Sequence, residues 1–335
     1  MNKKTIKIVI AAVVLVTLAL MLVVLPEKFF GHTHRPECEC SICSTMNKNL
    51  QPILEKTKEY VEREIDKKEI KDIAVYFRDL KSGSWFAINK DEKFNLASLI
   101  KVPLMMECLE SVESQPGMLQ KRLLFTGEKD WTSQQNIKPK KFLEPGRMYS
   151  LDEIMFRMIA YSDNNAMSML LNEFPGEGLD RFFSDHNIEY EKSPEGYLMS
   201  LGTYTTFFDT LYNQSLLNST MSKKALAYLD SEDFPQGMHA AVPVNVKIEG
   251  KFGEKILLDE HDNGKNAQLH EVGIVQAGDH PFILGIMTSG KDLIGLEKVI
   301  KEITHNVYEE NEQMTRYNSN NMDCMTRCHV NNSGA

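Results

Sequence analysis

The sequence lacks an excess of positive charge. Its 335 residues include 38 lysines and arginines against 47 aspartates and glutamates, which gives a formal net charge of −9 at pH 7. Proteins that bind nucleic acid usually present a basic face, so this balance argues against a nucleic-acid partner. The hydrophobic content of 42% is ordinary, and the chain is long enough to bury the core of one large domain or two small ones.

A complete zinc-peptidase motif is also missing. The segment HEVG, which begins at His270, lacks the second histidine of H-E-x-x-H, so a zinc peptidase is not indicated. We expect His270 instead to be a side chain at a strand edge near the functional site.

Cysteine is scarce, and most of it lies near the two ends of the chain. Outside the membrane such thiols can oxidise, which predicts disulfides between the two terminal clusters. The alternative is a metal site in which His34 or His329 joins the thiols, although C-x-C-x-x-C with C-x-x-x-C is not a standard zinc spacing. Cys108 stands apart on a predicted helix and is expected to be a buried core thiol. The terminal cysteines are Cys38, Cys40, Cys43, Cys324 and Cys328.

One long hydrophobic run stands out, at residues 8–25, and it carries no charge. A transmembrane helix needs roughly 17–25 residues, so the run predicts a single membrane anchor. Lys3, Lys4 and Lys7 precede it, which orients residues 1–7 to the cytoplasm and the rest of the chain outside. The following residues offer neither a small-x-small cleavage site nor a cysteine for lipidation, which argues for an anchor over a signal peptide.

Strand patterns at both ends of the remaining chain enclose a mostly helical middle. This order predicts an α+β fold in which distant parts of the chain form one sheet, with the first and last helices on the same face. The expected elements are a helix over 50–70, strands over 72–80 and 84–90, helices over 98–235 with long loops at 126–147 and 190–200, strands over 244–253, 269–277 and 282–289, and a helix over 293–314. The expected regions are a cytoplasmic segment (1–7), an anchor (8–25), a linker (26–47), one globular domain (48–312) and a polar tail (313–335).

Three short motifs occur in order: Ser98-Leu99-Ile100-Lys101, Ser162-Asp163-Asn164 and Lys251-Phe252-Gly253. Taken alone each is weak, since either serine is compatible with a helix N-cap and either lysine with a solvated surface. Their order and contexts make the set strong. One helical turn separates Ser98 from Lys101, so the two side chains share a face, where a base can take the proton of a nucleophilic hydroxyl.

With these motifs the chain resembles the class A β-lactamases and related penicillin-interacting serine hydrolases, whose signature is S-x-x-K, S-D-N and K-T-G. The resemblance covers roughly residues 50–312 and is closest in FNLASLIKVPL, MIAYSDNNA, AAVPVNVKIEGKFGE and LHEVGIVQAGDHPFILGIMTSG. It implies a β-lactamase/transpeptidase-like fold, with an antiparallel sheet flanked by helices beside an all-helical lobe. It also implies a monomer without a cofactor, which acts on a β-lactam or cell-wall peptide outside the bacterial cell membrane.

The resemblance implies a role for each matching side chain. Ser98 is the nucleophile, and Lys101 is its base, because burial beside a second cation depresses the pKa of a lysine. Ser162 relays a proton towards the leaving nitrogen, and Asn164 binds the amide side chain of the substrate. Lys251 is the second cation and attracts the substrate carboxylate.

The same resemblance assigns the oxyanion hole to backbone amides. These belong to Ser98 and to Glu254, the residue after Gly253, and N–H donors of this kind stabilise the charge that develops on attack. Asp163 is expected to hold the turn before the next helix.

Two positions depart from the family pattern. Phe252 stands where the third motif usually has Thr or Ser, so the hydroxyl that helps to bind the substrate carboxylate is absent. The loop that carries E-x-x-L-N in true class A enzymes corresponds to a shortened stretch at residues 189–206. Glu195 is its best candidate for activating the hydrolytic water, with Met199 in place of the asparagine; the alternative for Glu195 is a solvated loop carboxylate.

Three functions therefore stand open. The first is a membrane-anchored β-lactamase-like hydrolase with an acyl-enzyme on Ser98. The second is a D-Ala-D-Ala peptidase, or penicillin-binding protein, that uses the same residues and releases its product slowly. The third is an inactive binding module that retains the fold, which Phe252 and the shortened loop motivate.

Overall fold

The computed structural model describes residues 50–174, 178–258 and 265–332 of the chain. They belong to one compact unit, Asn49–Ala335, which is distinct from residues 1–48. The predicted anchor at residues 8–25 and the first three cysteines lie outside the described residues. None of the helices in the described ranges has the length and apolar character that crossing a bilayer requires.

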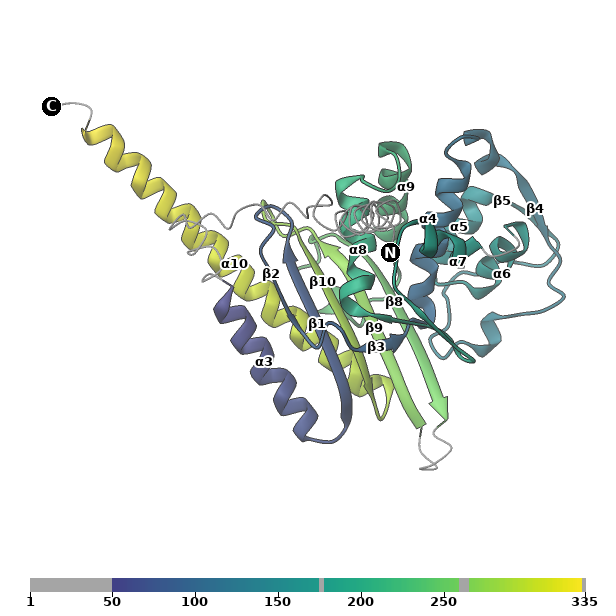
Figure 1. The fold of residues 1–335 in the computed structure, drawn as a ribbon, viewed down its shortest axis with the longest axis horizontal. Helices are drawn as coiled ribbons and strands as arrows, with labels where there is room; N and C mark the ends of the chain where they lie inside the picture. Colours follow the sequence, from purple (N-terminus) through teal and green to yellow (C-terminus); the bar gives the residue numbers. More distant parts are fainter. Residues whose placement is uncertain (1–49, 175–177, 259–264, 333–335) are drawn as a thin grey trace, which may run out of the picture. The chain divides into compact units, whose positions relative to one another are not determined.

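A five-stranded antiparallel sheet organises the unit, with the strand order β2-β1-β10-β9-β8. Its strands come from both ends of the domain, as predicted, and Figure 1 shows them side by side. They are β1 (Ile70–Asp79), β2 (Trp85–Ile88), β8 (Ile248–Leu258), β9 (Lys265–Val275) and β10 (Phe282–Gly290). The order leaves β8 at an edge, and this edge borders the site described below.

Helices α3 (Gln51–Asp66) and α10 (Leu293–Asn332) pack against each other on one face of the sheet. Lys56 Nζ donates to Glu310 Oε1 at 2.8 Å across the pair, which confirms that the first and last helices share a face. Helix α10 is longer than the pattern predicts, since it continues past residue 314. No glycine or proline between residues 296 and 332 is present to end it.

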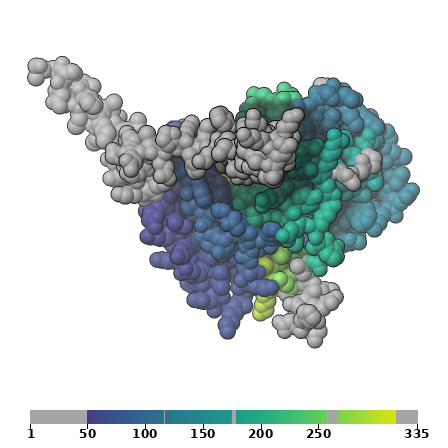
Figure 2. All heavy atoms as spheres, viewed as in Figure 1, coloured from purple at the N-terminus to yellow at the C-terminus, as the bar shows by residue number. Residues whose placement is uncertain are grey.

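Six helices form a lobe on the other side of the sheet (Figure 1), and the blue and green atoms on the right of Figure 2 belong to this part of the chain. They are α4 (Lys101–Val112), α5 (Leu151–Ala160), α6 (Asn164–Glu173), α7 (Gly178–Asp185), α8 (Leu201–Asn213) and α9 (Ser219–Leu229). Strand β1 serves both cores: Ala74 packs into the core under the lobe, whereas Ile73 and Val75 pack beneath α3 and α10. This alternation is the two-residue period of a strand, and it confirms the predicted α+β class.

The predicted loop at residues 190–200 contains a hairpin instead. Strands β6 (Glu191–Ser193) and β7 (Gly196–Ser200) pair with each other, and β7 also pairs with β3 (Lys93–Asn95). Strand β3 lies about one hundred residues earlier in the chain, so no local sequence pattern indicates that β7 pairs with it. The loop predicted at residues 126–147 is present between β4 (Arg122–Phe125) and β5 (Arg147–Ser150).

The described residues test only part of the cysteine predictions. Cys108 is fully buried in the core under the lobe, as predicted. Cys324 and Cys328 lie on the last part of α10, where the backbone alone is described. Among the side chains that are described, no three His, Cys, Asp or Glu residues are grouped to hold a metal ion.

Candidate active site

Ser98 lies in a short 3₁₀ turn, Ala97–Ile100, that leads directly into α4. Ala97 has a φ of +47°, in the left-handed region that non-glycine residues rarely adopt. Asn95 Oδ1 accepts a hydrogen bond from Ala97 N at 2.9 Å and holds this conformation. Strain of this kind costs about 1–3 kcal/mol and persists where the surroundings enforce it, often at functional sites. Ser98 is therefore held at a strained entry to α4 and is not a simple helix cap.

Lys101 is fully buried, so the solvated-surface interpretation is wrong for this residue. Its Nζ lies 3.1 Å from Ser98 Oγ and 3.0 Å from Ser162 Oγ. It also donates at 2.7 Å to the carbonyl oxygen of Ser162 and at 2.7 Å to Asn164 Oδ1. The first two sequence motifs thus meet at one amine.

Burial lowers the pKa of Lys101 well below the ordinary lysine value, and the positive charge of Lys251 lowers it further. The carboxylates of Asp163 and Glu254 oppose this shift without reversing it. A neutral amine has two N–H donors and one lone pair. The two 2.7 Å contacts are to acceptors that have no proton to give, so they use both donors, and the lone pair is left to face the two serine hydroxyls.

The second motif is anchored by its own aspartate. Asp163 is the N-cap of α6, and its Oδ1 accepts from Asn165 N at 2.8 Å. Its other oxygen accepts from Leu143 N at 2.8 Å, which ties the 126–147 loop to the motif. Ser162 has a φ of +54°, so the turn aims its hydroxyl and its carbonyl at Lys101 together. Asp163 therefore holds the turn, as expected.

Gln135 is a site residue that the sequence motifs did not reveal. Its side chain is nearly buried; Nε2 donates to Ser162 O at 3.0 Å and Oε1 accepts from Asn164 N at 3.4 Å. It lies in the long loop between β4 and β5, where no pattern distinguishes it from its polar neighbours.

Lys251 is fully buried on the edge strand β8, which rules out a surface lysine. Its Nζ donates to Phe252 O at 2.9 Å and lies 3.4 Å from Glu232 Oε1. Among the described residues it makes no hydrogen bond to Ser162. Ser98 and Ser162 thus meet at the Lys101 amine, whereas Lys251 acts on Lys101 through its charge and is itself paired with Glu232.

Two buried carboxylates, Glu232 and Glu271, surround the Lys251 amine. Glu232 Oε1 accepts from Phe252 N, and Glu271 Oε2 accepts from Met238 N at 2.9 Å. Burial raises the pKa of Glu232 and raises that of Glu271 well above its ordinary value; repulsion between the two carboxylates adds to the shift of Glu271. Neither belongs to a motif, and the sequence analysis missed both.

The Phe252 ring does not obstruct the cleft. It stacks on Phe234 at a centroid distance of 4.3 Å and belongs to the core beneath α3 and α10. Lys251 Nζ lies 4.1 Å from the centroid of the same ring, a cation–π geometry. Phe252 thus turns its ring away from Ser98 and offers no hydroxyl.

The open edge of β8 directs backbone amides towards Ser98. Phe252 N donates to Glu232, so this amide points away from β9. Amide directions repeat every second residue in an antiparallel strand, so the amide of Glu254 points to the same open edge.

Gly253 lets this edge come close to the turn that holds Ser98. A Cβ at this position would lie 3.1 Å from Ser98 N and 2.9 Å from Leu99 N. Any side chain would force the two backbones apart, so the approach requires glycine. The predicted oxyanion-hole amides, those of Ser98 and Glu254, accordingly border the same narrow space.

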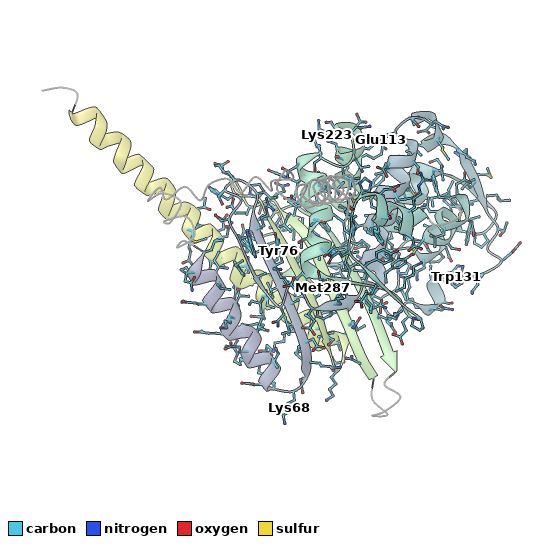
Figure 3. The ribbon with its side chains drawn as sticks, in the orientation of Figure 1. Lys68, Tyr76, Glu113, Trp131, Lys223 and Met287 are labelled. Atoms are coloured by element: carbon cyan, nitrogen blue, oxygen red, sulfur yellow. The ribbon has the colours of Figure 1, made fainter. Side chains whose placement is uncertain are left out.

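A pocket of about 670 Å³ opens beside Ser98. Asn164 and Glu254 line it, whereas Lys101 and Lys251 are fully buried and do not. Trp131, labelled in Figure 3, comes from the loop between β4 and β5 and forms part of its wall. Much of the remaining wall is apolar and includes Ile100, Leu104, Met167, Leu171, Leu179 and Tyr197.

Glu195 lies at the turn of the β6–β7 hairpin and also lines this pocket. Its carbonyl oxygen accepts from Asn95 Nδ2 at 3.1 Å and from Lys255 Nζ at 2.5 Å. Its side chain is exposed, and its carboxylate makes no hydrogen bond within the described residues. Met199 lies on β7, two residues after Tyr197, which lines the pocket. Its side chain is buried in the core and offers no polar group.

His270 corrects the expectation of a strand-edge side chain. It lies on β9, which is flanked on both sides by β8 and β10, and it is fully buried. Nδ1 accepts from Thr288 N at 3.1 Å, so Nε2 carries the proton and donates to Asn95 O at 3.0 Å. Burial lowers the pKa of His270 to about 4, and the neutral ring helps to position the segment before Ser98.

Glu254 closes one side of the cleft with its carboxylate. It accepts from Asn136 N at 2.9 Å and from Asn136 Nδ2 at 2.7 Å, and a third contact comes from Ile137 N at 3.3 Å. These bonds connect the edge strand β8 to the loop between β4 and β5.

Comparison with known proteins agrees with this architecture. A family model described as the β-lactamase enzyme family matches residues 56–311. A structure of a PBP-A mutant, described as an acyl-enzyme complex with penicillin-G, is 19% identical with a TM-score of 0.64, covering 78% of this chain and 98% of that one. A β-lactamase from Chitinophaga pinensis is 16% identical with a TM-score of 0.65, covering 76% and 98%. A class A β-lactamase from Mycobacterium abscessus is 16% identical with a TM-score of 0.63 and the same coverage. No curated protein matches the chain.

Proposed function

The chain belongs to the β-lactamase enzyme family, and on this basis we propose that it opens β-lactams or related amides through an acyl-enzyme on Ser98. The observation that carries the proposal is the set of contacts of the buried Lys101 amine. It lies within hydrogen-bond distance of the hydroxyls of both Ser98 and Ser162, while two other acceptors occupy its N–H donors.

Acylation then proceeds by three proton transfers. The lone pair of Lys101 Nζ accepts the proton of Ser98 as Oγ bonds to the substrate carbonyl carbon. The resulting oxyanion is bound by the amides of Ser98 and Glu254. As the C–N bond breaks, the Ser162 hydroxyl gives its proton to the leaving nitrogen and takes one back from Lys101. The proton lost by Ser98 thus ends on the leaving amine, and Lys101 is neutral again.

The acyl part of the substrate occupies the 670 Å³ pocket in this proposal. Asn164 Oδ1 is engaged by Lys101, so its Nδ2 is the group that donates to an amide carbonyl of the substrate. The apolar wall favours a hydrophobic group on the acyl side.

We propose slow release of the acyl group, with Glu195 as the base for the attacking water. Glu195 lines the pocket with Ser98, but its carboxylate is exposed and makes no hydrogen bond within the described residues that would orient it. A base held so loosely is a poor general base, and this favours the slow turnover of a penicillin-binding protein as the second candidate function.

Intact-mass spectrometry of the full chain over time, with a β-lactam whose carboxyl group is esterified, tests acylation and release together. We expect one acyl group per chain that persists, and we expect Glu195→Gln to prolong its lifetime by about tenfold or more without changing the rate of its formation. Equal lifetimes in the two proteins would identify Glu195 as a solvated loop carboxylate.

We also propose that residues 8–25 anchor the chain in the cell membrane with the catalytic domain outside. The apolar run and the preceding lysines support this. Deletion of residues 1–47 is expected to move the protein from the membrane fraction to the soluble fraction. Retention of the shortened chain in the membrane fraction would contradict an anchor in this segment.

A further inference from the structure

The Lys251 amine beside the catalytic groups has no free donor. One N–H is directed to Phe252 O at 2.9 Å, one to Glu232 Oε1 at 3.4 Å, and the amine also faces the Phe252 ring at 4.1 Å. An ammonium has three protons, so these three contacts account for all of them. The side chains of Lys251 and Glu232 are both fully buried.

The charge of Lys251 is also compensated. Glu232 balances it as the partner of a buried ion pair, so the two groups together carry no net charge. Glu271 is a second buried carboxylate beside it, close enough to act on the Lys251 charge. Within the described residues, one oxygen of Glu232 and one of Glu271 have no hydrogen-bond partner, so acceptors are in excess here.

The remaining groups near this end of the site add no anion-binding donor. Phe252 has no hydroxyl, and its ring lies in the core against Phe234. At the rim, Glu254 presents a further carboxylate, and Asn136 is already committed to it. A substrate carboxylate needs an accessible cation or several free donors, since a buried anion without them costs several kcal/mol. The residues around Lys251 supply neither, and Lys255, a cation that lines the pocket, donates to the carbonyl oxygen of Glu195 at the β6–β7 turn.

We infer that the substrate carries no negative charge on its leaving group, because Lys251 is neutralised by Glu232, shielded by Phe252 and closed off from the pocket. The substrate class is a neutral amide or ester, with its acyl part in the apolar pocket. This inference rests on the proposed acylation of Ser98. It distinguishes the chain from an enzyme that selects substrates by a carboxylate beside the scissile bond.

Two matched thioesters test the inference on the full chain. One has a thioglycolate leaving group with a free carboxylate, and the other is its methyl ester; both have the same hydrophobic acyl group. Rates of hydrolysis are divided by the rates in hydroxide without protein, so that intrinsic reactivity cancels. A fluorophosphonate is used separately to show that Ser98 reacts, because its leaving group carries no carboxylate.

We expect the methyl ester to be hydrolysed with a kcat/KM about tenfold or more above that of the free acid. In Glu232→Gln the glutamine still accepts from Phe252 N, but Lys251 loses its counter-charge, so the preference is expected to fall by about tenfold. Glu249→Gln is the matched control. Glu249 lies on β8 with Lys251, and its half-buried carboxylate accepts a hydrogen bond from Gln276, so the preference for the ester is expected to remain in this variant.

The results distinguish a failure of the inference about the leaving group from a failure of the proposed function. Fluorophosphonate labelling of Ser98 with equal rates for the two thioesters, or with a preference for the acid, overturns the inference and leaves the proposed function intact. A strong preference for the ester that is unchanged in Glu232→Gln also overturns it, since the buried charge pair would not be the cause. Absence of labelling at Ser98 overturns both.

Discussion

Replacing Lys101 with methionine should lower the rate of Ser98 acylation by about 10²–10⁴-fold, the usual contribution of a general base. Methionine has a similar length and no lone pair of comparable basicity, so the Ser98 proton has no acceptor nearby. The carbonyl of Ser162 and Asn164 Oδ1 also lose their donor. The measurement is the rate constant of covalent labelling, followed by mass spectrometry at substrate concentrations below saturation.

The pH dependence separates a catalytic role of Lys101 from a structural one. The charged form of Lys101 cannot act as a base, and the pKa of Lys101 is lowered well below the ordinary lysine value by burial and by Lys251. Acylation by the wild type should therefore be retained below the ordinary lysine range and decline as the pH falls through this lowered pKa. In Lys101→Met this decline should disappear. A variant that stays folded and keeps both the rate and the pH profile of the wild type would rule out Lys101 as the base.

Gly253→Ala should reduce acylation by about 10²–10³-fold, as loss of an oxyanion-hole donor does. The new Cβ would lie 2.9 Å from Leu99 N and 3.1 Å from Ser98 N, so β8 must move away from the turn that holds Ser98. That movement separates the amide of Glu254 from the amide of Ser98. Labelling kinetics of the variant measure the effect.

Gly285→Ala is the control for a general loss of packing. Gly285 lies on β10, where a Cβ would meet Leu201 Cδ1 at 2.7 Å and Thr205 Cγ2 at 3.1 Å, away from Ser98. We expect it to lower thermal stability while acylation is retained. Equal losses of acylation in both variants would attribute the effect of Gly253→Ala to unfolding.

Patterns that repeat along the chain made much of the fold predictable. The alternation in β1 and the apolar stripes of α3 and α10 predicted their types, and the strands at both ends predicted one shared sheet. The hairpin β6–β7 was not predictable in the same way, because its strands are short and β7 pairs with β3, which is far away in sequence. Helix α10 exceeded its predicted end because no residue that terminates helices follows its apolar stripe.

The candidate site was predictable only as far as its motifs extend. Ser98, Lys101 and Ser162 were found because their spacing and order carry the chemistry. Glu232 and Gln135 were not, since a single polar residue in a loop becomes a site residue only through tertiary contacts. The engagement of Lys251 by Glu232 has the same origin, and it changes what the third motif is expected to bind. The role of Glu195 remains a prediction.

The central claim is that Ser98 is a nucleophile activated by a neutral Lys101. Peptide mapping after treatment with a fluorophosphonate tests it most directly. We predict one label per chain on the peptide that contains Ser98, and none on Ser98→Ala under the same conditions. Equal labelling of the wild type and Ser98→Ala, or a label on another residue, would contradict the account.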